Sequence, residues 1–347
     1  MADRVAGVLG WRRTLVYCAD PRLQDELILG LLRDVVDASA SPVTFTRHWR
    51  RGAHLRVDWK PGAGADDGHG IAIEERLREW VRLHPSKDPQ DESQYLEQAT
   101  LLARLEHYDG QLLPRAPNNT VMPGRWLTRA RSLGSEEAAE AWQHFDVACN
   151  AVVFALVEQR RSDPHATMIA ALMFATAQEF FPPLESGYLS FRSHVEAFLA
   201  NTRDGECVRA GWRSRYRGVQ SRLRGELDRV RSESHSVPVQ AWLAAAAELT
   251  RVSIGLVSSG KLAMPVFDPR RAGMDGSSFH TELSQDEAAV ESLALSQQFT
   301  AYRVALNGLY RVFARAGLAP LERFEWCYLA SRTVEDHFQI QPPQWTR

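Results

Sequence analysis

The sequence has few cysteines, and those it has lie far apart. Cys18, Cys149, Cys207 and Cys327 are the only four in 347 residues, and none belongs to a Cys-x-x-Cys pair. Structural zinc sites and disulfide frameworks both use closely spaced cysteines. The spacing therefore argues against both kinds of structure and is typical of a protein of the reducing cytosol.

Three further features are missing. We expect no signal peptide, because the chain does not begin with a basic start followed by a hydrophobic segment; it begins Met1-Ala2-Asp3-Arg4. The longest apolar runs, near 147–157 and 168–177, are too short to span a bilayer. With 41 Lys and Arg against 43 Asp and Glu, the net charge is −2, which provides no basic field for nucleic acid. We therefore expect a soluble, cytoplasmic protein that binds neither membrane nor nucleic acid.

The sequence does have an ordinary globular composition, 44% hydrophobic and 24% charged, with its strand patterns concentrated in the first third. We expect an α+β fold that forms a single domain over 1–347: an antiparallel sheet flanked by many helices. A strand-rich part (1–130) precedes a helix-rich part (135–317). The chain then returns to the sheet in a final strand and tail (320–347), with the strand at Phe324–Leu329.

The clearest element is a β-hairpin at 43–59. Residues 54–59 alternate, with Leu55, Val57 and Trp59 on one side and polar residues on the other, and 43–49 is rich in β-branched and aromatic residues. Gly52 lies in the loop, where it can take a positive φ. We expect one buried face and one face that displays His54, Arg56 and Asp58, although composition alone favours a merely solvated sheet face.

This hairpin also carries a resemblance. The phrase Phe-x-Arg-x-Trp-x-x-Gly-Ala-His-Leu-Arg-Val at 45–57 is similar to a segment of the thiopeptide-type bacteriocin-biosynthesis domain, with Ala53 where that family has proline. The family contains the glutamate-elimination domains of lanthipeptide dehydratases and the stand-alone pyridine synthases. Pro-Asn-Asn-Thr at 117–120 and Tyr-x-Ser-x-x-Ser-His-x-Glu-Ala-Phe at 188–198 resemble pyridine synthase segments, but turn chemistry and an N-cap at Ser190 explain them as well.

His280 is the first candidate for chemistry. It follows a Gly- and Pro-rich loop at 264–276 and is flanked by hydroxyl side chains, so it can give and take protons near neutral pH, although a lone loop histidine is more often structural. In the elimination domains a His-Met-x-x-Asn-Arg element lies near this place. Here the text is His-Thr-Glu-Leu-Ser-Gln, which keeps the histidine and loses the Asn-Arg. The resemblance therefore favours a pyridine synthase over an elimination enzyme.

Such an enzyme joins two dehydroalanines of a modified precursor peptide in a formal [4+2] aza-cycloaddition, then releases water and the leader peptide. The resemblance implies no metal and no organic cofactor. It leads us to predict His280 with Ser278 as the proton-handling pair. The predicted phenol donors are Tyr302, Tyr310 and Tyr328, of which Tyr302 and Tyr310 fit equally as core aromatics. The predicted substrate-binding residues are Tyr188, Ser190, His194, His54, Arg56 and Trp212.

A basic helix is predicted at 207–232. Its arginines form an ordinary solvated face or dock an acidic leader peptide, and for the second role we name Arg209, Arg213 and Arg217. Two other functions stay open: a stand-alone elimination enzyme that makes dehydroalanine, and a non-catalytic subunit that binds the precursor peptide. The oligomeric state also stays open, with a homodimer as one expectation.

Overall fold

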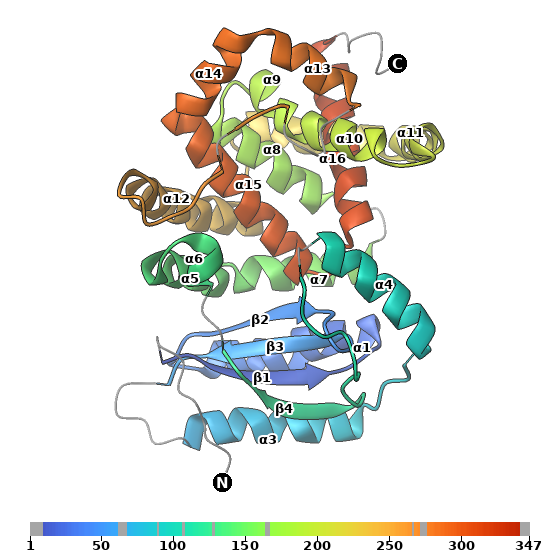
Figure 1. The fold of residues 1–347 in the computed structure, drawn as a ribbon, viewed down its shortest axis with the longest axis vertical. Coiled ribbons are helices and arrows are strands. Elements are labelled where there is room, and N and C mark those ends of the chain that lie inside the picture. Colours follow the sequence, from blue (N-terminus) through green and yellow to red (C-terminus); the bar gives the residue numbers. More distant parts are fainter. Residues whose placement is uncertain are drawn as a thin grey trace. The chain divides into compact units, whose positions relative to one another are not determined.

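The computed structural model describes residues 10–61, 68–88, 90–105, 108–126, 129–163, 167–265, 267–270 and 276–340. The chain divides into two compact units. Unit 1 comprises Met1–Arg131 with Asp146–Asn150, and unit 2 comprises Ser132–Phe145 with Ala151–Arg347. Unit 1 holds the sheet and unit 2 is helical (Figure 1), so the α+β prediction is confirmed.

Unit 1 is built on an antiparallel sheet with the strand order β2-β3-β1-β4. The strands are β1 (Arg12–Tyr17), β2 (Val43–His48), β3 (His54–Trp59) and β4 (Thr120–Gly124). The predicted hairpin is β2–β3, with Phe45 opposite Val57. Gly52 has φ +113° in its turn, so the expected positive φ is confirmed.

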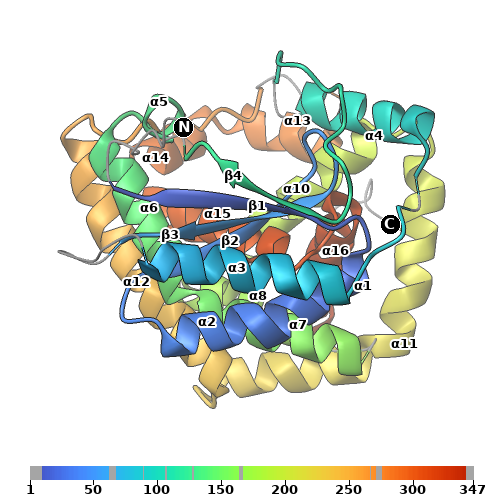
Figure 2. The ribbon, with the colours of Figure 1, turned by 90° about the horizontal axis from the view of Figure 1, so that it is seen from below.

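Helices cover one face of this sheet. They are α1 (Pro21–Leu27), the π-helical turn η1 (Ile28–Leu32), α2 (Arg33–Ala38) and α3 (Gly68–Leu83), which lie together behind the strands (Figures 1 and 2). Asp20 caps α1 by accepting from the Arg22 N–H at 2.8 Å, and Pro21 occupies the first helical position. Trp59 packs on α3 at Gly70, where a Cβ would come within 2.9 Å of the indole. The predicted apolar face of β3 is therefore the face that meets this helical layer.

The predicted display of a polar row on β3 is wrong. His54 and Asp58 are only 2% and 3% exposed. Asp58 is held by Arg13 of β1 through two hydrogen bonds of 2.7 and 2.8 Å. Asn150, which belongs to unit 1, lies on the same face and donates to the Val43 carbonyl at 2.8 Å. The alternation correctly predicted which side chains share a face of β3. The exposure of that polar face depends instead on the residues that contact it, Arg13 of β1 and Asn150.

The Asn-Asn phrase has a structural role in unit 1. Asn119 takes φ +59°, and its side-chain oxygen accepts from the Ser86 N–H at 2.8 Å. Asn118 accepts from the Ala19 N–H at 3.0 Å and from the Ser86 hydroxyl at 3.0 Å. These bonds fasten the start of β4 to the end of β1 and to the segment after α3. The turn interpretation therefore explains this phrase.

Unit 2 packs its helices around α8 (Met168–Phe180), whose first ten residues are all buried. Such a helix, apolar all round, is a core helix. Its neighbours are α9 (Leu184–Gly187), α11 (Gly205–Arg231), α12 (Val237–Ser258), α15 (Gln297–Arg315) and α16 (Pro320–Phe338). The remaining helices are α4 (Glu92–Leu105) in unit 1, α5 (Ala130–Leu133), α6 (Glu136–Ala148), α7 (Asn150–Ser162), α10 (Leu189–Ala200), α13 (Ser278–Gln285) and α14 (Glu287–Leu295).

Helix α12 is long and apolar enough to cross a membrane on length and composition alone. Its Trp242, Ala246 and Leu249 are buried, and the Trp242 indole donates to the Thr176 hydroxyl of α8 at 2.9 Å. A helix whose apolar side chains pack on two neighbours in this way is a core helix, so we assign no membrane span to it.

The predicted final strand is wrong, because Phe324–Leu329 lies inside helix α16. Alternating aromatic residues made this stretch resemble a strand, since they favour sheets. Pro320 at the first helical position and Glu322, which accepts from the Ala319 N–H at 2.8 Å, start a helix instead. Packing against α10, α11 and α8 then buries its aromatic and aliphatic side chains, so tertiary contacts override the local preference.

Candidate active site

His280 lies in unit 2 near the start of α13, and its ring is 2% exposed. Its Nδ1 is hydrogen-bonded to the Ser277 hydroxyl and its Nε2 to the Ser193 hydroxyl of α10, both at 2.8 Å. The predicted partner, Ser278, is exposed at the first position of α13. The pairing of His280 with Ser278 is therefore wrong by one residue, because the helix begins at Ser278 and leaves the buried N-terminal position to Ser277.

Burial lowers the pKa of His280, while the nearby Glu196 carboxylate acts in the opposite direction. A neutral imidazole has one N–H donor and one acceptor nitrogen, so one serine hydroxyl accepts a hydrogen bond from the ring and the other donates one to it. Ser193 is half-buried, and its contact with His280 is less buried than the contact between Ser277 and His280. The arrangement can pass a proton between His280 and a group that binds at Ser193.

The residue after Ser193 begins a second cluster. His194 Nδ1 lies 3.1 Å from the Tyr310 hydroxyl of α15, and that hydroxyl lies 3.5 Å from Cys327 Sγ of α16. Burial, with a smaller contribution from Arg323, lowers the pKa of His194 to about 4, and burial raises the pKa of Tyr310 well above its usual range. Near neutral pH the pair is thus a neutral imidazole beside a protonated phenol, which is an acceptor next to a donor.

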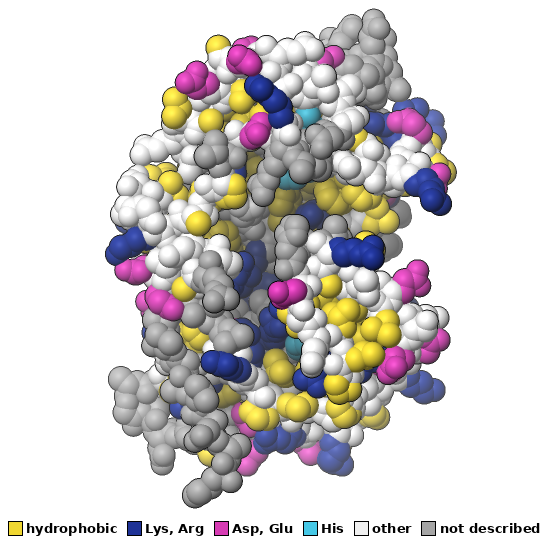
Figure 3. Space-filling model, viewed as in Figure 1, with side chains coloured by type: hydrophobic (Ala, Val, Ile, Leu, Met, Phe, Trp, Pro, Cys, Tyr) yellow, Lys and Arg dark blue, Asp and Glu magenta, His cyan; other side chains and the backbone are white. Residues whose placement is uncertain are grey.

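Helix α10 therefore brings together the side chains of four helices. Consecutive residues, Ser193 and His194, contact His280 of α13 on one side and Tyr310 of α15 on the other, with Cys327 of α16 behind the phenol. Histidine side chains reach the surface of unit 2 near α10 and α13, beside apolar side chains (Figure 3). We call Ser193, His194, Ser277, His280 and Tyr310 the α10 cluster.

Several predicted residues lie in the core of unit 2 instead. Tyr302 is fully buried, donates to the Gly187 carbonyl at 2.6 Å and stacks on Phe181, so its alternative interpretation as a core aromatic is the correct one. Tyr328 and Trp212 are 3% and 6% exposed, with ring centroids 5.8 Å apart. Neither ring is exposed enough to contact a substrate as predicted.

Two residues of the 188–198 phrase differ in their exposure. Tyr188 is buried beside Glu335 and Arg192, and burial raises the pKa of its phenol to about 12. Ser190 is half-buried in the first turn of α10, one helical turn before His194. Ser190 thus stays a candidate for substrate binding, whereas Tyr188 supports the start of the helix.

The sequence reasoning missed Ser193, Ser277, Cys327 and Arg323. Ser193 stands in the phrase that resembles pyridine synthases, so its position there was the available indication. Nothing in the sequence marks Cys327 or Arg323, because their relation to Tyr310 depends on how α15 packs against α16.

Unit 1 has a cationic cluster on the polar face of its sheet. His54 Nδ1 is 2.8 Å from the Gly52 carbonyl, and its buried Nε2 has no hydrogen-bond partner within the described residues. Arg56 is half-buried, and its Nε also lacks a partner there. Burial, reinforced by Arg13, lowers the pKa of Arg56 to about 9. Two unsatisfied donors or acceptors beside unbalanced positive charge suit an anion or a carbonyl oxygen.

His54 makes stability depend on pH. Burial lowers its pKa from 6.5 to about 4, so the unfolded chain binds a proton at a higher pH than the folded protein does. We expect the contribution of His54 to the free energy of unfolding to fall by roughly 3 kcal/mol as the pH drops from about 6.5 to about 4, at 1.36 kcal/mol per pKa unit. Urea unfolding across this range measures the loss.

The matched variants are His54→Asn, which should reduce the pH dependence without removing it because the pKa of His194 is also lowered to about 4, and His144→Gln, whose side chain is 58% exposed and which should leave it unchanged. Equal slopes for the wild type and His54→Asn would show that His54 does not contribute.

The predicted leader-binding arginines separate into two kinds. Arg209 is buried and gives two hydrogen bonds of 2.9 Å to Glu196, so its assignment to leader binding is wrong. Arg213 and Arg217 are exposed and lie four residues apart on α11. Basic side chains, which on α11 are all arginines, reach the surface over this helix (Figure 3).

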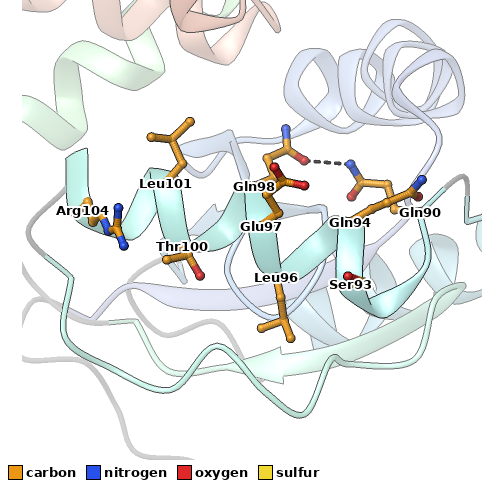
Figure 4. A pocket seen from close by; sticks show the side chains of 9 residues that line it. All are labelled: Gln90, Ser93, Gln94, Leu96, Glu97, Gln98, Thr100, Leu101 and Arg104. Atoms are coloured by element: carbon orange, nitrogen blue, oxygen red, sulfur yellow. Dashed lines mark hydrogen bonds between the residues drawn. The ribbon is translucent and has the colours of Figure 1, made fainter.

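A hollow of about 900 Å³ lies along α4 in unit 1 (Figure 4). All of its lining residues come from α4 and the residue Gln90 before it: Gln90, Ser93, Gln94, Leu96, Glu97, Gln98, Thr100, Leu101 and Arg104. None of the predicted site residues is among them. Because a single helix lines it, we regard it as a furrow of the surface and not as the active site.

Residues 11–334 match the family model described as "Lantibiotic biosynthesis dehydratase C-term". Among solved structures, the chain is similar to the pyridine synthase TbtD from thiomuracin biosynthesis, with 28% sequence identity, a TM-score of 0.75, and coverage of 95% of this chain and 99% of that one. It is also similar in fold to TsrL, with 16% identity, a TM-score of 0.62 and coverage of 95% of both chains. A search of curated proteins found no matching sequence.

Proposed function

The chain belongs to the lantibiotic biosynthesis dehydratase C-terminal family, and we propose that it is an enzyme of thiopeptide biosynthesis, a pyridine synthase. TbtD, which is named a pyridine synthase, is similar to it over 95% of this chain. The observation that carries the proposal is the α10 cluster, in which two adjacent residues of α10 contact different groups: Ser193 contacts the His280 imidazole and His194 contacts the Tyr310 phenol. Such a set supports chemistry that moves protons without a redox step or a metal.

The proposed reaction joins two dehydroalanines of a linear peptide. One dehydroalanine amide must first become its iminol, which requires a base at the amide N–H and a proton donor at the amide oxygen. In our proposal Tyr310 donates at the oxygen, and His280 accepts the N–H proton through Ser193. The second alkene then adds across the resulting azadiene, and loss of water and of the leader as an amide gives the pyridine. No cofactor enters this scheme.

Positioning contributes more than proton transfer in this scheme. Holding two alkenes in near-attack geometry is worth roughly 7–11 kcal/mol of a barrier. Proton transfer by positioned side chains adds about 10²–10⁴-fold. The half-buried hydroxyls of Ser190 and Ser193 are our candidates for holding the reacting amides, because a helix fixes their spacing.

One incubation tests the proposal. A precursor peptide that bears its azoles and two dehydroalanines is mixed with the protein, and the products are identified by mass spectrometry. The proposed synthase splits this substrate into a macrocycle and a leader amide. A linear peptide that loses glutamate from a glutamylated precursor would instead identify an elimination enzyme. Binding without any change of mass would identify a peptide-binding subunit.

We further propose that Arg213 and Arg217 bind an acidic leader. Changing both to glutamate should raise the Kd of the leader-bearing peptide about 10-fold, since each exposed charge pair contributes up to about 1 kcal/mol. The effect should shrink at high salt, because exposed pairs are screened. Fluorescence anisotropy with a labelled peptide measures it, and the same peptide without its leader is the control. A double variant that binds both peptides as the wild type does would place the leader elsewhere.

A further inference from the structure

Arg323 lies near the start of α16, on the same part of unit 2 as the α10 cluster. Its guanidinium carbon is 4.9 Å from the centroid of the Tyr310 ring and 5.0 Å from that of Phe324. Arg323, Tyr310 and Phe324 are all half-buried. The cation therefore lies beside the Tyr310 ring, neither fully buried nor fully exposed.

Arg323 differs from its neighbours in having no acidic partner in the described part of the chain. The two acidic residues nearest to it in sequence are used elsewhere, since Glu322 pairs with Arg160 and Glu325 pairs with Arg215. The buried arginines of α10 and α11 are likewise neutralised, Arg192 and Arg209 both by Glu196. A half-buried guanidinium without a carboxylate is an unbalanced charge that an anionic or polarised oxygen of a ligand would balance.

The positive charge of Arg323 affects the pKa values of the groups around Tyr310. The positive charge of Arg323 lowers the pKa of His194, and at Tyr310 and Cys327 it opposes the upward shift caused by burial. All three groups therefore experience this cation. It favours a neutral His194 and would stabilise negative charge that develops beside the Tyr310 hydroxyl.

The contacts of Arg323 with the two rings do not satisfy the N–H donors of its guanidinium. A cation near an aromatic ring is attracted through its charge, whereas its N–H donors need oxygen or nitrogen acceptors. The contacts of Arg323 in the described part of the chain are with the two rings, and neither ring face provides such an acceptor. The N–H donors of Arg323 therefore stay available to another molecule.

We propose that Arg323 is a catalytic residue that binds the oxygen of the reacting dehydroalanine amide, an inference that rests on the proposed function. When the amide N–H bond breaks toward Ser193 and His280, the nitrogen lone pair forms the C=N bond and negative charge moves to the amide oxygen. Arg323 holds that charge until the Tyr310 phenol supplies its proton to the oxygen. The proton count is balanced, since one proton leaves the nitrogen and one reaches the oxygen. This transfer leaves one extra proton on His280 and one proton missing from Tyr310, and exchange with solvent water restores both groups before the next turnover.

The test compares Arg323→Gln, Arg323→Lys and the wild type in turnover of the dehydroalanine peptide, with peptide binding measured separately. Removing one donor to a developing oxyanion typically costs about 10²–10³-fold in kcat. We expect Arg323→Gln to lose about 10²-fold in kcat with the peptide Kd nearly unchanged, because the charge is met mainly in the transition state. Arg323→Lys keeps the charge and should recover most of the loss.

The control is Arg251→Gln, an exposed arginine that pairs with Glu248 on its own helix, and it should turn over as the wild type does. Wild-type kcat in Arg323→Gln, or equal losses in the Gln and Lys variants, would overturn the role of Arg323 while leaving the proposed function intact. A wild-type protein that forms no macrocycle would overturn both. Thermal unfolding of each variant shows whether a lower rate reflects lost structure.

Discussion

Replacing His280 by alanine is expected to lower kcat for macrocycle formation about 10²–10⁴-fold while the peptide Kd stays within about 2-fold of the wild type. His280 is buried and touches Ser193 and Ser277, so a bound peptide would meet the serine hydroxyl and not the imidazole. The imidazole of His280 should therefore affect kcat, which includes proton transfer, and not the Kd of the peptide. Rapid mixing with the dehydroalanine peptide and mass analysis of quenched samples measure the rate, and anisotropy measures the affinity.

Serine variants sharpen this prediction. Ser193→Ala should lower kcat, since it breaks the path between His280 and the substrate. Ser278→Ala is the matched control, because this exposed serine precedes the same histidine by two residues and should be silent. If Ser278→Ala slowed the reaction and Ser193→Ala did not, the hydrogen-bonding pattern around His280 would be wrong. Undiminished turnover by His280→Ala would exclude the histidine from the chemistry altogether.

Glu196→Ala is expected to destabilise the protein by roughly 3–5 kcal/mol. Glu196 is 5% exposed and lies between two buried arginines, with 3.0 Å to Arg192 Nε and 2.9 Å to both terminal nitrogens of Arg209. Within the described residues, its loss leaves Arg209 with the exposed Glu206 as its one acidic partner. Arg192 keeps Glu335, at 3.4 Å. Removing one member of a buried ionic group is costly because the remaining charges stay out of water.

Glu206→Ala provides the comparison. Glu206 pairs with the same Arg209 at 3.2 Å, but its side chain is 83% exposed. Exposed pairs contribute about 0–1 kcal/mol, so the two carboxylates of one arginine should differ several-fold in their effect. Chemical denaturation of both variants gives the two numbers. Similar losses for both would mean that burial does not govern this network.

The local elements of unit 1 followed from the residues themselves. The β2–β3 hairpin was recognisable from its alternation and from Gly52, and both are properties of a few neighbouring residues. The same reasoning failed at α16, where alternating aromatics imitate a strand. It also failed for the exposure of His54 and Asp58, since exposure depends on Arg13 and Asn150, which are distant in sequence.

The residues predicted for the candidate site also divide into those that the structure supports and those that it does not. His280, His194 and Tyr310 were chosen from residue type and from the resemblance, and the structure brings His194 and Tyr310 into contact. Tyr302, Tyr328 and Trp212 were chosen for the same reasons, yet they are core residues. A tyrosine on a long amphipathic helix has the same neighbours in sequence whether it faces a core or a cavity. Only the position of the other helices separates the two cases.

The sequence by itself determined the family, the α+β class and the hairpin, because these depend on short phrases and on periodicity that a chain carries before it folds. Tertiary structure alone decided which serine meets His280, which arginines are neutralised by carboxylates and which one, Arg323, is left without a carboxylate partner in the described part of the chain. Several of those outcomes depend on contacts between residues far apart in the sequence: 87 positions for Ser193 and His280, 162 for Arg160 and Glu322, and 110 for Arg215 and Glu325. Such contacts arise only when whole helices pack, and no local pattern records them.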